Sequence, residues 1–139
     1  MTPGFAPLLV AASAAIVLVF GALHLLYTFQ GGRLDPREAG TRQAMEQSSP
    51  RITRETTVWR AWIGVNATHS LGLMLFGLIY AYLALAAPGL LFASPFLQGL
   101  GLVLLASYVV LARRYFFSVP FRGVVLATAL YLAGIAAAA

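Results

Sequence analysis

The chain has 139 residues, of which 60% are hydrophobic and only 9% are charged. Soluble domains carry about a quarter charged residues, so this chain has too few charges to cover a water-facing surface, and its composition excludes a soluble globular fold. Its nine basic residues are all arginines and outnumber the four acidic residues. In so apolar a chain we interpret this excess as a sign of membrane topology, and we expect no nucleic-acid partner. Cysteine is absent, which excludes disulfides, thiolate metal sites and cysteine nucleophiles.

Four apolar runs are each long enough to cross a membrane, because about 20 helical residues span a hydrocarbon core of roughly 30 Å. A signal peptide would require a basic residue before its apolar core. None precedes the first run, so we expect an uncleaved helix there. Short connections make neighbouring helices antiparallel. The sequence therefore predicts an all-α integral membrane fold, an up-down four-helix bundle that forms a single domain over residues 1–139. The predicted spans cover residues 7–29, 57–86, 95–112 and 120–137.

The connection between the first two spans, residues 31–56, is a hydrophilic stretch. Asp35 can cap a helix and Pro36 suits the first helical position. The sequence therefore predicts a short helix over residues 36–47, lying at the cytoplasmic membrane surface between spans one and two.

Turn residues mark two further boundaries. Ser-Ser-Pro at positions 48–50 ends the short helix, and we expect the second spanning helix to begin near Arg51 and to project from the bilayer before it enters at Trp59. Residues 87–95 carry no charge and contain a Pro-Gly pair, which predicts a loop.

All nine arginines lie in or beside the first and third connections. Cytoplasmic loops are the ones enriched in basic residues, so we expect an inner-membrane protein with both termini outside the cytoplasm. Five of these arginines are candidate ligands for a phosphate or carboxylate headgroup, with ordinary topology-setting charge as the alternative. They are Arg54, Arg60, Arg113, Arg114 and Arg122.

Polar and amphipathic side chains of the second span recur on one helical face, at about 100° per residue. This stripe comprises Glu55, Trp59, Trp62, Asn66, His69, Leu73, Gly77 and Tyr80, with Ser70 beside it. Polar groups are costly against lipid, so we expect the stripe to face the bundle interior, with its most polar end towards the cytoplasm. The first and third spans carry matching stripes, and the fourth span adds two residues. These are Ser13, Phe20, His24, Thr28 and Gly31, with Tyr27 at the edge; Gly101, Leu105, Tyr108, Ala112 and Tyr115; and Thr128 and Tyr131.

These stripes predict a site for a lipid or a hydrophobic small molecule in the cytoplasmic half of the bundle, with membrane lipids as partners. The candidate ligand-binding residues are His24, Tyr27, Trp59, Trp62, Asn66, His69 and Tyr108. One alternative is a membrane enzyme in which His24 and His69 act as acid–base groups or hold haem b. Another is a structural subunit whose stripe meets a partner helix, in a homo-oligomer or a larger membrane complex.

The sequence assigns no catalytic residue and leaves open whether the chain is an enzyme. We expect no cofactor and no metal site. His24 and His69 differ in expected depth by roughly 7 Å, whereas axial haem ligands face each other at one level. Zinc requires three or more ligands, and all four acidic residues lie in the first connection. Ser70 adjoins His69 but points about 100° away on a helix, which argues against a serine nucleophile.

Overall fold

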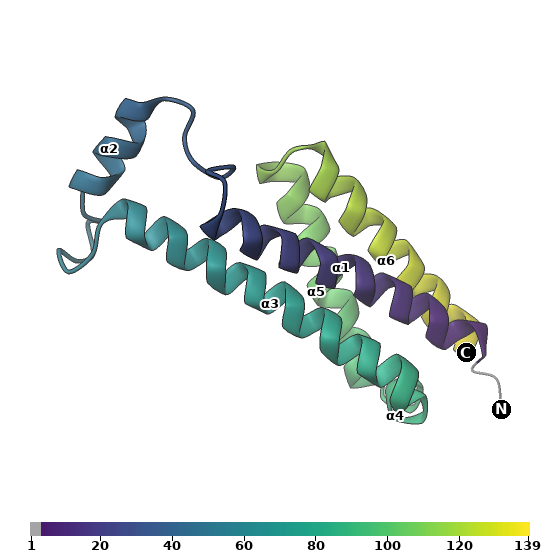
Figure 1. The fold of residues 1–139 in the computed structure, drawn as a ribbon. Coiled ribbons are helices and arrows are strands. Elements are labelled where there is room, and N and C mark those ends of the chain that lie inside the picture. The colour runs from purple at the N-terminus through teal and green to yellow at the C-terminus, as the bar shows by residue number, and fades with distance from the viewer. Residues whose placement is uncertain (1–3) are drawn as a thin grey trace. The chain divides into compact units, whose positions relative to one another are not determined.

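The structure, a computed structural model, describes residues 4–139, and this part of the chain contains helices and no strands. The helices are α1 (Phe5–Phe29), α2 (Ala39–Gln47), α3 (Val58–Ala86), α4 (Pro88–Ala93), α5 (Pro95–Tyr115) and α6 (Ser118–Ala138) (Figure 1). Within the described residues, four of them, α1, α3, α5 and α6, are long and apolar enough to cross a membrane. The predicted all-α class and the four candidate spans are confirmed.

Helix α3 begins at Val58, so the prediction that it starts near Arg51 is wrong. The hydroxyl of Thr57 accepts a hydrogen bond from the backbone N–H of Arg60 at 3.2 Å, which is the geometry of an N-terminal cap. The backbone before this cap is held in turns: the N–H of Val58 donates to the carbonyl oxygen of Ser48 at 2.8 Å. A threonine cap therefore sets the start of the helix, and the preceding residues close a loop.

Helix α2 begins at Ala39, later than the predicted start at position 36. Its N-cap residue is Glu38, whose side chain makes no capping hydrogen bond. The expected cap, Asp35, instead binds the guanidinium of Arg42 at 2.7 Å. Asp35 thus forms an ion pair with Arg42 in place of the helix cap predicted from the sequence.

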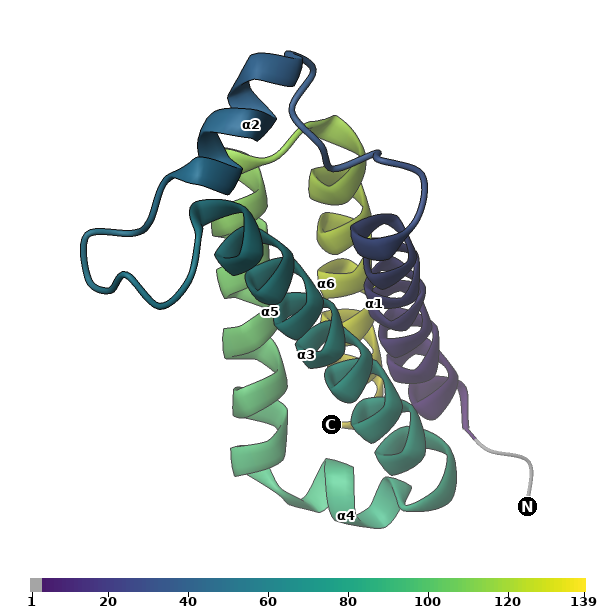
Figure 2. The same cartoon turned by 60° about the vertical axis from the view of Figure 1, so that its left-hand side comes forward.

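Residues 87–95, predicted as a loop, contain the short helix α4 between α3 and α5 (Figure 2). Leu91 of this helix is fully buried, and the side-chain amide of Gln98 donates to the carbonyl oxygens of Leu91 and Phe92, at 3.3 and 2.8 Å. The hydroxyl of Ser94 then caps α5 by accepting from the N–H of Leu97 at 3.3 Å. Burial of Leu91 and the amide of Gln98 stabilise a helix that is too short to be predicted from periodicity.

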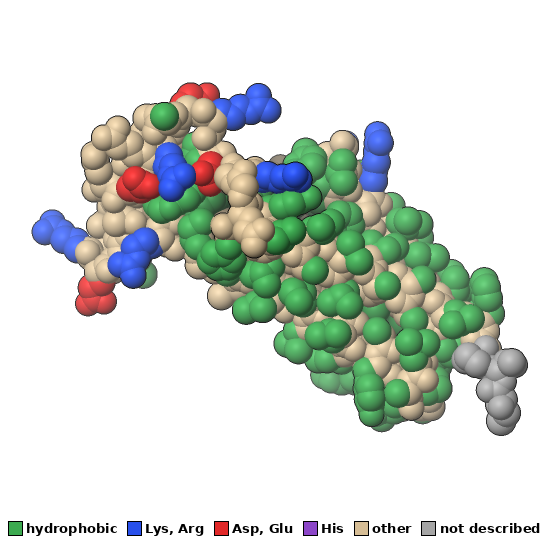
Figure 3. Space-filling view, viewed as in Figure 1, with side chains coloured by type: hydrophobic (Ala, Val, Ile, Leu, Met, Phe, Trp, Pro, Cys, Tyr) green, Lys and Arg blue, Asp and Glu red, His purple; other side chains and the backbone are tan. Residues whose placement is uncertain are grey.

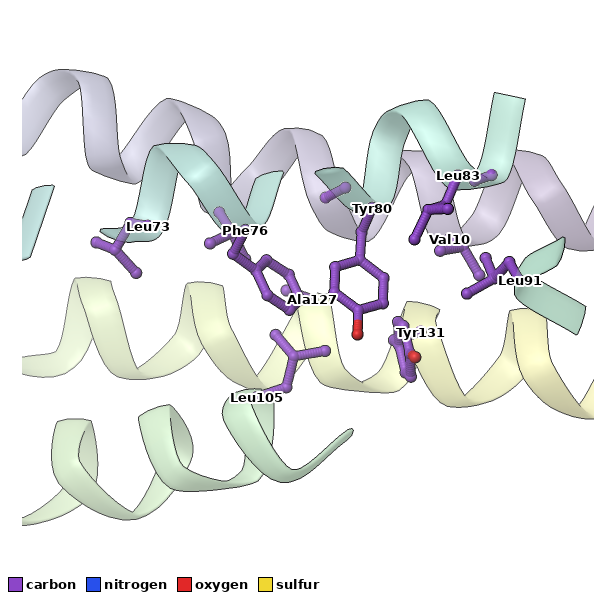
Figure 4. Close-up of a cluster of buried hydrophobic side chains, with 12 residues drawn as sticks. Val10, Leu73, Phe76, Tyr80, Leu83, Leu91, Leu105, Ala127 and Tyr131 are labelled. Atoms are coloured by element: carbon purple, nitrogen blue, oxygen red, sulfur yellow. The ribbon is translucent and has the colours of Figure 1, made fainter. Parts of the chain in front are cut away.

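The chain divides into two compact units, which we call the core unit (residues 1–20 and 73–139) and the polar unit (residues 21–72). In the core unit, buried side chains from α1, α3, α4, α5 and α6 form one apolar cluster (Figure 4). Its members are Val10, Ala14, Val17, Leu73, Phe76, Tyr80, Leu83, Ala84, Leu91, Leu105, Ala127 and Tyr131.

Two buried tyrosines bring polar atoms into this cluster and pair them with the backbone of α5. The hydroxyl of Tyr80 donates to the carbonyl oxygen of Leu97 at 2.7 Å, and that of Tyr131 donates to the carbonyl oxygen of Gln98 at 2.9 Å. Gly101 makes this approach possible, because a Cβ atom there would overlap both tyrosine rings. Each hydroxyl therefore has a hydrogen-bond acceptor within the protein, as buried tyrosines usually do.

Helices α1 and α3 approach each other closely at Gly77 in the core unit. A Cβ atom at this position would lie 2.8 Å from the carbonyl oxygen of Ala14 and 2.9 Å from Cα of Leu18. Backbone atoms of a helix cannot move aside as a flexible side chain can. The absence of a side chain at Gly77 therefore sets the spacing of the two helices, as small residues do where membrane helices pack.

Replacing Gly77 with alanine should destabilise the protein by about 1–3 kcal/mol, the usual cost of inserting a methyl group into a packed interior. Gly72→Ala on the same helix is the matched control, because a Cβ atom there meets nothing within 4 Å. Unfolding of both variants in detergent measures the difference. Equal stability of the two variants would mean that Gly77 does not set the helix spacing.

Candidate functional site

A hydrogen bond joins the candidate spans α1 and α3 within the polar unit. Nε2 of His24 on α1 lies 2.9 Å from Oδ1 of Asn66 on α3. The amide Nδ2 of Asn66 donates to the carbonyl oxygen of Trp62, one turn earlier, at 2.8 Å. Asn66 is only 9% exposed, so both ends of its amide are paired away from the surface.

These contacts fix the proton on His24. The carbonyl oxygen of Trp62 can only accept, so the amide of Asn66 must present its NH₂ group there and its oxygen to His24. An amide oxygen can only accept as well, so Nε2 of His24 carries the hydrogen. In the neutral imidazole, Nδ1 of His24 is then a hydrogen-bond acceptor.

The second histidine touches the first. The ring centroids of His24 and His69 are 5.3 Å apart, with the planes at 85°, an edge-to-face contact. The expected depth difference of roughly 7 Å is therefore wrong. His24 is level with Asn66, three residues before His69, and a helical side chain leans towards the N-terminus of its helix, which brings His69 back towards His24.

Hydroxyl groups beside this cluster bond within their own helices. Ser70 donates to the carbonyl oxygen of Asn66 at 2.7 Å and is fully buried, and Thr28 donates to the carbonyl oxygen of His24 at 2.8 Å. Ser70 thus has a carbonyl acceptor for its proton, which is a structural role and not that of a nucleophile next to a base. Ser13, in the core unit, is also fully buried, and among the described side chains its hydroxyl is the one buried polar atom without a hydrogen-bond partner.

The stripe on α3 faces inward over only part of its length. Asn66, Ser70, Leu73 and Tyr80 are buried, as predicted. Trp62 is 41% exposed, which contradicts its inward assignment. The exposed Glu55 precedes α3, so the helical angle assumed for it does not apply. Tyr115, placed on the inward stripe of the third span, is 71% exposed, whereas Gly101, Leu105 and Ala112 of that stripe are buried.

Arg42 makes the ion pairs and the ring contact that stabilise the hydrophilic connection. Its guanidinium binds the carboxylates of Asp35 at 2.7 Å and Glu46 at 3.0 Å, and its Cζ lies 4.6 Å from the centre of the Trp59 ring. The hydrogen bond to Glu46 is the largest of the effects that raise the pKa of Arg42, so the guanidinium stays charged. Figure 3 shows arginine and acidic side chains gathered around α2. Arg42 was not among the predicted site residues, although its i,i+4 spacing to Glu46 is visible in the sequence.

Two further contacts join this connection to the candidate residues. The indole N–H of Trp62 donates to the carbonyl oxygen of Leu34 at 3.3 Å. Cζ of Arg33 lies 4.5 Å from the centre of the Tyr27 ring, a cation–π contact. Trp59, Trp62 and Tyr27 therefore all contact residues from the segment that follows α1.

The candidate ligand-binding residues thus divide between the units. His24, Tyr27, Trp59, Trp62, Asn66 and His69 belong to the polar unit, whereas Tyr108 belongs to the core unit and packs against its apolar cluster. The headgroup candidates Arg54 and Arg60 lie in the polar unit, and Arg113, Arg114 and Arg122 lie in the core unit. All five are exposed.

The arrangement of the histidines bears on the haem alternative. A haem held between His24 and His69 needs its plane between the two rings and a nitrogen lone pair from each. The rings are in direct contact, and Nε2 of His24 holds its hydrogen for Asn66. The described residues also contain no group of three or more His, Asp or Glu side chains placed to hold a metal ion. As arranged, His24 fits the role of hydrogen-bond partner to Asn66, in ring contact with His69, better than that of an iron ligand.

Comparisons with family models, curated proteins and solved structures found no match for this chain. The geometry of the polar unit is therefore the basis for a functional proposal.

The His24–Asn66 bond should contribute to stability. In a double-mutant cycle with His24→Ala and Asn66→Ala, we expect a coupling of about 0.6 kcal/mol and at most about 1.7 kcal/mol, the range found between membrane helices. Unfolding in detergent gives the four stabilities. A cycle of His24→Ala with Thr68→Ala is the control, because the hydroxyl of Thr68 donates only within α3, to the carbonyl oxygens of Gly64 and Val65. Additivity in both cycles would contradict the bond.

Replacing Arg42 with glutamine should loosen the hydrophilic connection, because it breaks two ion pairs and a cation–π contact together. Amide hydrogen exchange of residues 33–57 should become faster, while exchange in the spanning helices should not change. Arg37→Gln removes the same charge from the same connection and should have the smaller effect. Similar exchange in both variants would mean that charge alone orders this segment.

Proposed function

We propose that this chain is a multi-pass inner-membrane protein that binds a lipid or a hydrophobic small molecule at the cluster of His24, Asn66 and His69. It forms an up-down four-helix bundle, with both termini outside the cytoplasm and the cluster in its cytoplasmic half. Four helices of spanning length support the membrane assignment. The confinement of all nine arginines to positions 33–60 and 113–122 supports the orientation.

The contact between two histidines inside spanning helices is the observation that carries the binding proposal. Ionisable side chains are rare in such helices and mark ligand or ion sites when they occur. Helix packing alone needs only the bond from His24 to Asn66. His69 adds a second imidazole that contacts the first, and neither residue is fully buried. A ligand that lies in the membrane can therefore approach the pair from the exposed side of these residues.

The position of the hydrogen on the neutral His24 ring suggests the chemistry of that ligand. With Nε2–H donated to Asn66, the neutral ring offers the lone pair of Nδ1. A hydroxyl group is the simplest partner for an acceptor in an apolar setting, because it donates one hydrogen and carries no charge. We therefore expect a largely apolar molecule with a hydroxyl or similar donor.

Native mass spectrometry of the gently solubilised full chain tests the proposal. Wild-type protein should carry a co-purifying adduct, and Asn66→Leu should weaken its retention, because the change releases His24 from its fixed orientation. Thr68→Val is the matched control: it changes a polar side chain on the same helix to an apolar one, and Thr68 is exposed and bonds only within α3.

The alternatives give different results in the same preparation. Wild-type protein without an adduct contradicts the binding proposal, and a stable co-purifying protein would then favour a structural subunit. A Soret band that is lost in His24→Ala and in His69→Ala would instead indicate haem. Equal adduct retention in Asn66→Leu and Thr68→Val would mean that the ligand lies elsewhere.

Reporter fusions test the orientation separately. A fusion at Gly40 should report the cytoplasm, and a fusion at the C-terminus should report the opposite side, because the arginines set the cytoplasmic loops. The reverse pattern would overturn the orientation and leave the binding proposal standing.

A further inference from the structure

A shallow hollow lies at the turn between α5 and α6, in the core unit. Its volume is about 300 Å³. Small-molecule sites have volumes of roughly 300–1,000 Å³, so the hollow suits a compact headgroup and not a whole lipid. It is lined by two arginines, one serine, three phenylalanines and one alanine: Arg113, Arg122, Ser118, Phe116, Phe117, Phe121 and Ala112.

The charge around this hollow has one sign. Residues 1–20 and 73–139 contain three charged residues, all arginines, and no acidic residue. All three arginines lie near the connection between α5 and α6, in the last turn of α5 or near the start of α6. Two of them, Arg113 and Arg122, line the hollow. The core unit therefore supplies no carboxylate to balance these two guanidinium groups, and an anion from outside it can do so.

The side chain of Arg113 is held in place. Its Cζ lies 5.5 Å from the centre of the Phe121 ring, so an arginine on α5 reaches across to α6. A guanidinium placed over an aromatic ring can still bind an anion, because its N–H groups point outward in the plane of the guanidinium. The start of α6 adds further donors, because its N-cap residue, Phe117, makes no side-chain capping bond and Ser118 brings a hydroxyl into the same hollow.

We propose that this hollow binds the phosphate group of an anionic membrane lipid. Arg113 and Arg122 bind the phosphate oxygens, and Ser118 donates a further hydrogen bond. The aromatic side chains favour a lipid as the source of the phosphate: Phe116 is 51% exposed and Phe117 is 70% exposed, beside the ends of two candidate spans. Tyr115, directly before them, is 71% exposed, and amphipathic tyrosine rings at the ends of spanning helices lie at the headgroup level of a membrane.

Topology-setting charge alone does not account for this arrangement. Orientation depends on the number of arginines in a connection and not on where their side chains point. Arg114 supplies the same charge in the same turn of α5 and does not line the hollow. The three arginines therefore offer an internal comparison between a specific site and a diffuse basic surface.

Titration of the full chain in neutral detergent with short-chain phosphatidylglycerol, followed by native mass spectrometry, tests the proposal. Arg113→Gln and Arg122→Gln should each weaken binding about tenfold or more, the effect of removing one charge-assisted hydrogen bond to the phosphate. Arg114→Gln should change binding less than twofold. Thermal unfolding of the three variants, whose changed side chains are all exposed, checks that each remains folded.

Phosphatidylcholine and inorganic phosphate complete the experiment. Phosphatidylglycerol should bind more tightly than phosphatidylcholine, and millimolar inorganic phosphate should not displace it. Equal weakening in all three variants would overturn the site in favour of a diffuse surface charge. Displacement by inorganic phosphate would overturn a lipid as the source of the phosphate. Wild-type affinity in Arg113→Gln and Arg122→Gln would contradict phosphate binding in this hollow. None of these outcomes depends on the ligand proposed for His24 and Asn66.

Discussion

A polar side chain in a membrane-spanning helix cannot turn to water, so it must find its hydrogen-bond partner within the protein. Asn66 meets this constraint with both ends of its amide, one on the carbonyl oxygen of Trp62 and one on His24. Tyr80 and Tyr131 meet it by donating to carbonyl oxygens of α5. Each of these pairings fixes which face of a helix is turned inward, and the apolar packing then follows.

The two units answer this constraint in different ways. The core unit is almost free of charge, and its polar atoms pair with backbone around an apolar cluster. The polar unit holds all four acidic residues and six of the nine arginines. Arg42 pairs there with Asp35 and Glu46, and Arg42 and Arg33 contact aromatic rings. In the contact of His24 with His69, two ionisable rings from α1 and α3 meet edge to face. Such rings are rare in long apolar helices, which is the reason to look for a ligand there.

Much of the fold could be predicted from the sequence, because the signals are local. Length and hydropathy were enough to give the four candidate spans, and angular position identified Asn66, Ser70 and Tyr80 as inward-facing. The same reasoning failed for Trp62, whose indole N–H donates to the carbonyl oxygen of Leu34, a partner that helical angle does not reveal. It also failed for the start of α3, because it assumed one continuous helix from Arg51, whereas the hydroxyl of Thr57 caps the helix six residues later.

The sequence by itself determined the four helices of spanning length and the polar face of α3, since these depend on composition and on helical periodicity. Only the tertiary structure decided which partners the polar groups take. Asn66 meets His24 across 42 positions, and Asp35 leaves its expected role as a helix cap because Arg42 competes for its carboxylate. Periodicity places a residue on a face of its own helix. The identity of its partner depends on how a second element packs against that face, which no local pattern contains.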